Sequence, residues 1–579
     1  MSNSAQTRIK IALAQANPTV GDLDGNIAKL VEMRARAHTL GADLVVFPEL
    51  FVTGYPPEDL VLRPAFQLAA RRRVETLAAE LGPGPGVLTG TIWPEEGNVY
   101  NALVLLDGGK VEAVRFKADL PNYGVFDEKR IFSQGRMPGP INFRGVRLGV
   151  PICEDIWGPD VTECLAEAGA EILISVNGSP FDWTKPDARM NKVVARITET
   201  GLPLAYLNQM GGQDELVFDG ASFVLNADCS LAVQAPSWEE VVILSEWRKT
   251  PEGWHCTHGR CAVVEEGDAA AYQACLLGIR DYVNKNGFPG VIVGLSGGID
   301  SALVTAIATD ALGPERVRTV MMPYRYTSSE SLRDAEACAT ALGLRYDVLP
   351  IEAAIAGVKE TLAPVLAGTE PDATEENIQA RVRGIILMAI SNTFGDMVVT
   401  TGNKSEMSVG YATLYGDMNG GFNPVKDLYK TEVYRLARWR NAHVPKGAMG
   451  PAGIVIPETI ITRVPSAELR PDQTDQDSLP PYDILDDILA SLVEKETPID
   501  EIVAQGYPAD IVRQVERLLY IAEYKRRQAA PGVKISSRNF GRDRRYPITN
   551  RFREDVDATP TAKAKTEAGA TLIARKKDA

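Results

Sequence analysis

The chain has 579 residues, 45% of them hydrophobic, which is enough for two large domains or three smaller ones. Acidic residues (76) outnumber Lys and Arg (61), and the resulting net charge of -15 argues against a general nucleic-acid binder. No apolar run reaches the roughly 18 residues that a membrane span needs, and the N-terminus does not read as a secretory signal. Seven scattered cysteines indicate neither a disulfide framework nor a zinc site. These features predict a soluble cytoplasmic protein without nucleic-acid or membrane partners.

Strand-like and helix-like segments alternate over residues 1–240. Apolar runs bounded by turn residues occupy 10–15 and 44–47, and the apolar residues between them fall near helical spacing. A further helix is expected over 187–200. Further strands are expected at 87–93, 102–106, 146–152, 171–176, 204–207 and 221–225. The pattern predicts a layered α/β domain with many strands.

Residues 241–267 show little periodicity and are interpreted as a linker. After them we expect a helix over 268–286, a buried strand over 290–295 and a glycine-rich turn that opens the next helix. Because strand–helix units repeat, residues 268–550 are predicted to form a doubly wound parallel α/β sheet. Residues 551–579, rich in Ala, Thr and Lys, are interpreted as a flexible tail.

Three strand-like segments of the first domain end in a reactive or charged residue: Glu49, Lys117 and Cys153. Side chains at strand ends of α/β proteins project into a common mouth. A thiol must lose its proton before it attacks, so Glu49 could be the base and Lys117 the cation that stabilises the thiolate and the oxyanion. The alternatives are a buried structural cysteine and a structural ion pair. The four histidines lie outside segments that read as active-site loops, which disfavours Ser-His-Asp and Cys-His chemistry.

The segments around these residues resemble the nitrilase superfamily of carbon–nitrogen hydrolases, and 54–60 and 208–215 resemble the glutaminase domain of glutamine-dependent NAD synthetases. The resemblance implies an αββα sandwich in which Cys153 attacks the glutamine carboxamide, Glu49 takes the thiol proton and Lys117 steadies the oxyanion. It also implies an additional glutamate beside the triad and three residues that hold glutamine. These are Glu128 and then Tyr123, Ser179 and Lys185.

The segment 294–301, Gly-Leu-Ser-Gly-Gly-Ile-Asp-Ser, follows an apolar strand and opens a helix. Gly297 and Gly298 let the backbone pass close to a phosphate, and the helix N-terminus offers free N–H groups. Asp300 is unusual at an anion site unless it also holds a cation, and magnesium on a nucleotide fits. The pattern is neither a Walker loop nor a dinucleotide-binding fingerprint, and the alternative is a plain strand-to-helix turn.

This segment resembles the pyrophosphate loop of ATP pyrophosphatases, and the chain beyond it resembles NAD synthetases over most of 271–550. The resemblance implies a domain of the adenine-nucleotide alpha-hydrolase-like type. The segments that carry it are 322–329, 376–383, 401–406, 415–417 and 465–468. Leu414 departs from the ammonia-dependent members, which tend to carry Lys there, so the dinucleotide contacts near it stay open.

The resemblance assigns a role to individual residues of this second domain. The expected ATP contacts are Gly294, Leu295, Ser296, Gly297, Gly298, Ile299, Asp300, Ser301, Thr401, Lys430 and Ser466. The expected deamido-NAD contacts are Asn377, Arg381, Glu406 and Lys534, and Asp300 with Glu406 would hold Mg²⁺. From the residues alone, Arg381 and Arg383 could be a solvated helix face, and Lys430 could be a helix-end charge.

The two halves together predict a ligase that releases ammonia from glutamine and uses it to amidate adenylated deamido-NAD. The predicted reaction is deamido-NAD + ATP + L-glutamine + water → NAD + AMP + diphosphate + L-glutamate. A passage poor in water between the sites would keep ammonia unprotonated. The resemblance also implies a homo-oligomer, often an octamer. The alternatives are another glutamine-fed adenylating ligase, a catalytically silent nucleotide sensor and a plain amidase.

Overall fold

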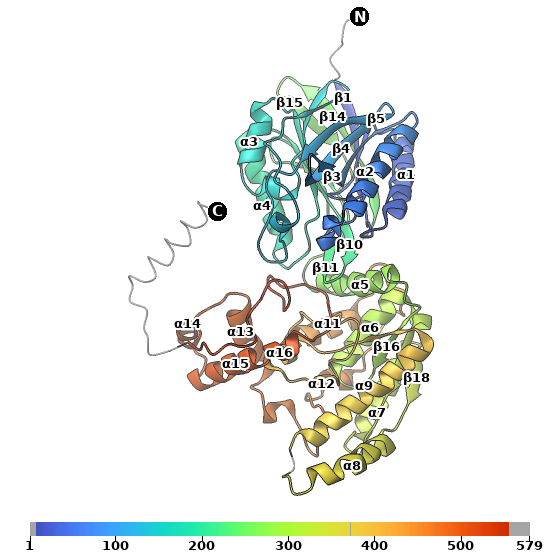
Figure 1. The fold of residues 1–579 in the computed structure, drawn as a ribbon, viewed down its shortest axis with the longest axis vertical. Helices are drawn as coiled ribbons and strands as arrows, with labels where there is room; N and C mark the ends of the chain where they lie inside the picture. Colours follow the sequence, from blue (N-terminus) through green and yellow to red (C-terminus); the bar gives the residue numbers. More distant parts are fainter. Residues whose placement is uncertain (1–6, 371, 555–579) are drawn as a thin grey trace, which may run out of the picture.

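The computed structural model describes residues 7–370 and 372–554. Figure 1 shows two halves stacked along the long axis of the molecule, with the chain up to β15 in one half and from α5 onward in the other. The larger part of the predicted tail, residues 555–579, lies outside the described residues.

Two β-sheets that face each other form the first domain. The seven-stranded sheet has the order β15-β14-β1-β2-β3-β4-β5, and the six-stranded sheet has the order β13-β12-β9-β8-β7-β6. The strands of the first are β1 (Arg8–Gln15), β2 (Leu44–Val46), β3 (Gly86–Glu95), β4 (Asn98–Asp107), β5 (Lys110–Phe116), β14 (Val241–Thr250) and β15 (Gly253–His258). Those of the second are β6 (Ile141–Phe143), β7 (Val146–Gly149), β8 (Ile172–Asn177), β9 (Leu204–Asn208), β12 (Phe223–Leu225) and β13 (Leu231–Gln234).

Helices cover the outer face of each sheet. Helices α1 (Leu23–Thr39) and α2 (Pro64–Glu80) bury one apolar face each against the seven-stranded sheet. Helices α3 (Asp160–Glu167) and α4 (Lys185–Thr200) do the same against the six-stranded sheet. A third apolar layer fills the space between the sheets, so the predicted αββα sandwich is confirmed.

The segment predicted as a linker, 241–267, contains two strands of the first domain instead. Strand β14 pairs antiparallel with β1 from Arg8↔Arg248 to Gln15↔Val241, and β15 pairs with β14 at the edge of the sheet. The periodicity was weak in sequence because Ser245 and Trp247 are buried beside charged neighbours. Residues 259–266 alone then separate the first domain from helix α5.

Four parallel strands form the sheet of the second domain, in the order β18-β17-β16-β19. These are β16 (Val291–Gly294), β17 (Val317–Met321), β18 (Arg345–Val348) and β19 (Met397–Val399). Helices α5 (Gly267–Lys285) and α6 (Ile299–Leu312) pack on one face, and α8 (Glu352–Leu366) and α9 (Thr374–Phe394) pack on the other. The predicted doubly wound sheet is confirmed, and its topological switch point lies between β16 and β19.

Helix α7 (Ser329–Ala341) packs against β17 and β18 and contributes Ala335, Cys338 and Ala339 to the core on the side of α5 and α6. The remaining helices surround the carboxyl ends of these strands or extend away from the sheet (Figure 1). They are α10 (Lys404–Val409), α11 (Lys430–Ala442), α12 (Glu458–Thr462), α13 (Tyr482–Val493), α14 (Ile499–Ala504), α15 (Ala509–Ile521) and α16 (Glu523–Arg526). Among the described residues, no helix combines the length and the apolar character that a membrane span requires.

The two domains share a hydrophobic core. The hairpin of β10 (Met210–Gln213) and β11 (Leu216–Asp219) leaves the first domain and contributes to the core that surrounds α5 (Figure 1). Asp281 of α5 accepts a hydrogen bond from the Gly212 N–H at 2.7 Å, and Lys285 donates to the Gly212 carbonyl at 2.8 Å. The domains are therefore joined by packing as well as by the chain.

Gly90 of β3 allows the loop after β2 to cross directly over it. A Cβ added at this position would lie 2.1 Å from the Leu50 nitrogen. We expect Gly90→Ala to destabilise the first domain by about 1–3 kcal/mol, seen as a lower midpoint in thermal unfolding. Gly82→Ala is the control, since its Cβ would have nothing within 4 Å. Equal midpoints for the two variants would contradict this account of the loop.

Candidate active sites

Three charged side chains meet inside the first domain, and all are almost completely buried. Lys117 Nζ lies 2.8 Å from Glu49 Oε1 and 2.9 Å from Glu128 Oε2. Glu49 Oε1 also accepts from Asn101 Nδ2 at 2.7 Å, and its Oε2 accepts from the Gly178 N–H at 2.9 Å. Glu49 and Lys117 follow β2 and β5 of the same sheet, so the ends of these strands bring them together.

Cys153 lies at the start of a short 3-10 turn that follows β7, and it is buried beside this cluster. Its φ of 47° is in the left-handed region, which is costly for a residue other than glycine and is characteristic of functional turns. Asp155 holds the turn, because its carboxylate accepts from Ile152 N–H at 2.9 Å and from Asp119 N–H at 2.8 Å. The turn that bears Cys153 is thereby tied to the loop that bears Lys117.

The charges around Cys153 favour a thiol that is protonated at rest. Burial raises the pKa of Cys153, the charge of Glu49 raises it further, and Lys117 lowers it. The thiol therefore needs a base nearby, and Glu49 is the buried carboxylate with the stronger effect on it. Burial also raises the pKa of Glu128 to about 7, against the opposing effect of Lys117.

The three residues expected to hold glutamine surround this cluster with different exposures. Tyr123 is half-exposed, and its hydroxyl donates to Glu154 at 3.0 Å. Ser179 is buried, and its Oγ accepts from Arg189 Nε at 3.1 Å. The Lys185 ammonium lies 4.4 Å from the centre of the Trp157 ring, and burial lowers its pKa. The charge of ionised Cys153 raises the pKa of both Lys185 and Tyr123, so both side chains lie within electrostatic range of this residue.

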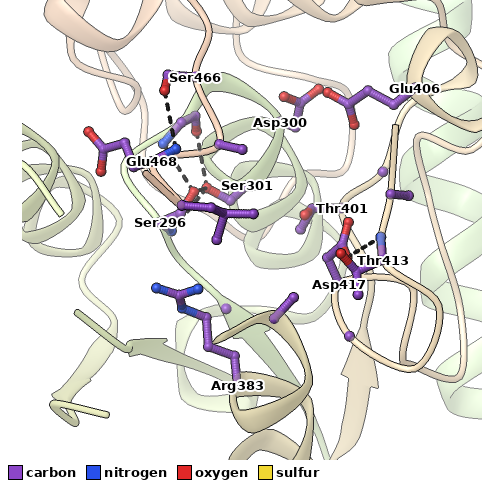
Figure 2. A pocket seen from close by; sticks show the side chains of 18 of the residues that line it. Ser296, Asp300, Ser301, Arg383, Thr401, Glu406, Thr413, Asp417, Ser466 and Glu468 are labelled. Atoms are coloured by element: carbon purple, nitrogen blue, oxygen red, sulfur yellow. Dashed lines mark hydrogen bonds between the residues drawn. The ribbon is translucent and has the colours of Figure 1, made fainter. Parts of the chain in front are cut away.

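A cavity of about 460 Å³ opens at the carboxyl ends of the strands of the second domain. Figure 2 shows the side chains that line it, with the loop after β16 on one side and residues of α9 on another. All of the loop residues from Gly294 to Ser301 line this cavity. Polar groups from several elements converge on this cavity, and it lies at the switch point where α/β sheets bind ligands.

The loop after β16 is built to keep its backbone close to a ligand. Gly297 has a φ of +83°, and a Cβ there would lie 2.4 Å from the Ser331 carbonyl oxygen. The two serines at its ends brace the turn: Ser296 N–H donates to Ser301 Oγ at 3.2 Å, and Ser301 donates to the Gly298 carbonyl at 3.0 Å. Helix α6 begins directly after Gly298, so its free N–H groups face the cavity.

One ammonium group lies between two carboxylates at the floor of this cavity. Lys430 Nζ is 2.6 Å from Asp300 Oδ2 and 3.0 Å from Glu406 Oε1. Burial raises the pKa of Glu406 to about 8; the positive charge of Lys430 lowers this pKa, and the negative charge of Asp300 raises it further. Two oxygen-donor side chains around a cationic position suit Mg²⁺, which typically takes one or two carboxylates plus phosphate and water oxygens.

The remaining predicted residues of this domain divide into two groups. Thr401, Ser466 and Asn377 line the cavity together with the residues already described. Arg381 and Lys534 do not line it. Arg381 is exposed and donates to the Leu414 carbonyl at 3.2 Å, whereas Lys534 is buried and pairs with Asp543 at 3.2 Å.

Asp475 and Arg383 also line the cavity, and Asn403 lies beside its carboxylates. None of the three was predicted from the sequence to have a binding role, and Arg383 was left as a possible solvated helix face. Asn403 Nδ2 donates to Asp300 at 2.7 Å, and its Oδ1 accepts from the Glu406 N–H at 3.0 Å, so it links the Asp300 carboxylate to the backbone of Glu406. Asp475 accepts from Tyr482 at 2.8 Å, and its other oxygen has no hydrogen-bond partner among the described residues. Arg383 points into the cavity, and burial lowers its pKa to about 10 (Figure 2). Only the helix N-cap position of Asn403 carries a local sequence signal.

The comparisons with known proteins cover both domains. The family model of NAD synthase matches residues 271–529, and that of carbon–nitrogen hydrolase matches residues 10–249. The glutamine-dependent NAD(+) synthetase of Rhodobacter capsulatus is 52% identical over 548 residues, which are 94% of this chain and 99% of that protein. The protein of the same name from Acinetobacter baylyi is 46% identical over the same shares of both chains.

Among solved structures, the glutamine-dependent NAD+ synthetase from Acinetobacter baumannii in complex with adenosine diphosphate superposes with a TM-score of 0.74. It is 43% identical, and the match covers 94% of this chain and 99% of that one. Both halves of the present chain, each with its own buried site, are thus found joined in the same order in these relatives. The chain belongs to the family of glutamine-dependent NAD(+) synthetases, which are ligases.

Proposed function

We propose that this chain converts deamido-NAD to NAD with ammonia that it takes from glutamine, at the expense of ATP. The overall reaction is deamido-NAD + ATP + L-glutamine + water → NAD + AMP + diphosphate + L-glutamate. The observation that carries the proposal is the presence of two complete sites in one chain. A buried Glu49–Lys117–Cys153 cluster occupies the first domain, and a glycine-rich loop faces carboxylates across the cavity of the second.

At the first site, Cys153 attacks the carboxamide carbon of glutamine after Glu49 takes the thiol proton. Lys117 stabilises the negative charge that develops on the carbonyl oxygen. Ammonia leaves with a proton from Glu49, and Glu49 then activates a water molecule that hydrolyses the thioester to glutamate. Tyr123, Ser179 and Lys185 are proposed to hold the amino-acid end of glutamine, for which hydroxyl and ammonium groups near the thiol are suited.

At the second site, the loop 294–301 with Thr401, Lys430 and Ser466 is proposed to bind ATP, and Asp300 with Glu406 would hold Mg²⁺. Bound Mg²⁺ would neutralise part of the phosphate charge. The carboxylate of deamido-NAD attacks the α-phosphorus and diphosphate leaves, so an acyl adenylate forms. Ammonia then displaces AMP from the acyl carbon.

The contacts with deamido-NAD are proposed in the same cavity. Asn377 lines it beside the loop that carries Thr413, and Glu406 reaches it from α10. Arg381 and Lys534 belong to the proposed set as well, but each would have to leave its present partner to reach the dinucleotide. Arg383 is a partly buried cation that already lines this cavity, and we add it to the residues proposed to bind the nucleotide substrates.

We further propose a cytoplasmic homo-oligomer, an octamer by analogy with the family. Val365 of α8 and Ile385 of α9 are large apolar side chains that the single chain leaves exposed, which is consistent with a contact between copies. Sedimentation measurements on the full chain would test the oligomeric state.

Cys153→Ala should abolish glutamine-driven NAD synthesis and leave ammonia-driven synthesis nearly unchanged, because only the first site uses the thiol. NAD and glutamate are measured with glutamine or an ammonium salt as the nitrogen donor. Cys164→Ala, on α3, should retain both activities. Parallel loss of both activities in Cys153→Ala would contradict the assignment of the two sites, and a wild-type chain that never forms NAD would contradict the whole function.

Asp300→Asn should reduce AMP formation by about a hundred-fold with either nitrogen donor, because it removes one of two carboxylates proposed to hold the cation. AMP release is the measurement. Asp483→Asn on α13 changes an exposed carboxylate and should have no effect. Normal AMP release from Asp300→Asn would exclude Asp300 from the adenylation step.

Arg383→Met should raise the KM for ATP by about ten-fold or more, since a buried charged hydrogen-bond donor is worth roughly 1.5–3 kcal/mol. Initial rates over a range of ATP concentrations give the KM. Arg333→Met on the exposed face of α7 is the matched control. An unchanged KM for both nucleotide substrates would remove Arg383 from the site.

A further inference from the structure

We propose that Asn101 of β4 is a positioning residue of the first site, which fixes the Glu49 carboxylate and makes Glu49, rather than Glu128, the carboxylate that stays ionised. The inference rests on the glutaminase activity proposed above. It concerns a residue that contacts the catalytic base and takes no part in bond making itself.

Asn101 connects two of the three charged residues of the cluster, Glu49 and Lys117, to strand β4. Its side chain is 1% exposed, and its Nδ2 donates to Glu49 Oε1 at 2.7 Å. Its backbone carbonyl accepts the Lys117 N–H at 2.9 Å. Asn101 itself is held in register opposite Ile92 of β3 in a long antiparallel pair. A shift of Asn101 would therefore move Glu49 and Lys117 together.

The orientation of the Asn101 amide follows from the charge beside it. If the amide were turned over, its oxygen would face the Glu49 carboxylate and the two acceptors would repel each other. In the present orientation its Oδ1 has no hydrogen-bond partner among the described residues. In this orientation the Asn101 amide donates to Glu49 but leaves its own buried oxygen without a hydrogen-bond partner in the described part of the chain. The unpaired oxygen costs stability, so we infer that the donor to Glu49 serves a function.

The hydrogen bonds of the two carboxylates indicate what the Asn101 donor does. Two buried carboxylates share the single ammonium of Lys117. Lys117 donates to one oxygen of Glu49, at 2.8 Å, and to both oxygens of Glu128, at 3.0 and 2.9 Å. Apart from Lys117, Glu49 accepts two N–H groups, from Asn101 and from the Gly178 backbone, whereas Glu128 accepts one hydroxyl among the described residues, that of Tyr55 at 3.0 Å. Hydrogen bonds to a carboxylate stabilise its ionised form. The asymmetry places the negative charge on Glu49 and the proton on Glu128, whose pKa burial raises to about 7.

This assignment matters for catalysis because Glu49 can take the thiol proton only when it is ionised. Without the Asn101 donor the two carboxylates become nearly equivalent, and in part of the molecules the proton moves from Glu128 to Glu49. Such molecules have no base for Cys153. Glutaminase activity should then need a higher pH to reach its plateau.

The test is the pH profile of kcat for glutamate release by the full chain, compared between wild type, Asn101→Leu and Asn101→Asp. Asn101→Leu removes the donor without adding a charge, whereas Asn101→Asp keeps the shape of the side chain and places a further carboxylate beside Glu49. We expect the acidic limb to move up by about one pH unit, so that activity at any pH on this limb is lower by about ten-fold. Ammonia-driven AMP formation, measured on the same samples, should be unchanged and reports that the chain is folded.

Tyr55→Phe provides the opposite change, because it removes the donor of Glu128 instead. Its acidic limb should stay in place or move down. Asn98→Ser, at the exposed start of the same strand, is the matched control and should keep the wild-type profile. A wild-type acidic limb in the Asn101→Asp variant, or an upward shift of equal size in Tyr55→Phe, would overturn the inference.

These outcomes separate the inference from the function on which it rests. If the wild-type chain releases no glutamate from glutamine at any pH, the proposed function fails. If the wild-type chain is active and the Asn101 variants keep its pH profile, only the role of Asn101 fails.

Discussion

Burial of a single ammonium group between two carboxylates occurs at both sites of this chain, and much of the structure exists to maintain it. Lys117 lies between Glu49 and Glu128, and Lys430 lies between Asp300 and Glu406. Removing such charges from water is expensive unless each is paired and hydrogen-bonded. One lysine balances only one carboxylate, and burial raises the pKa of the second carboxylate, to about 7 for Glu128 and about 8 for Glu406. In the first domain this leaves Glu49 as the proposed base for the thiol, and in the second the two carboxylates are proposed to hold a cation.

The surrounding framework explains how such clusters remain rigid. Their members come from the ends of different strands or from helix starts next to them, which the sheets hold at fixed separations. Short polar side chains then cross-link the members: Asn101 of β4 contacts Glu49 through its side chain and Lys117 through its backbone carbonyl, and Asn403 ties Asp300 to Glu406. The two domains are also in direct contact, because Trp183 N–H, two residues before Lys185, donates to the Ile535 carbonyl at 3.1 Å.

The strands and helices that carry the sites could largely be predicted, because apolar runs such as 10–15 and 290–295 end in turn residues. The segment 241–258 could not, since its strands alternate buried Ser245 and Trp247 with charged neighbours. Cys153, Glu49 and Lys117 share strand-end positions, but residue type alone left a structural ion pair equally possible. Resemblance to known families predicts a catalytic triad of these residues, and in the folded chain Glu49 and Lys117 lie 2.8 Å apart. Arg381 and Lys534 show the limit of such transfer, because local contacts draw both side chains away from the cavity.

The amino-acid sequence by itself determined the two-domain α/β plan, the position of the glycine-rich loop and the identity of the candidate reactive groups, because these depend on local periodicity, glycine placement and residue chemistry. Only the tertiary structure decided which carboxylates share a lysine, which side chains supply the remaining hydrogen bonds and which cation faces the cavity. Asn101, Asn403, Arg383 and Asp475 have no distinctive pattern along the chain. Their roles arise because burial makes every unpaired charge costly, and the cost depends on neighbours that are distant in sequence and adjacent only after folding.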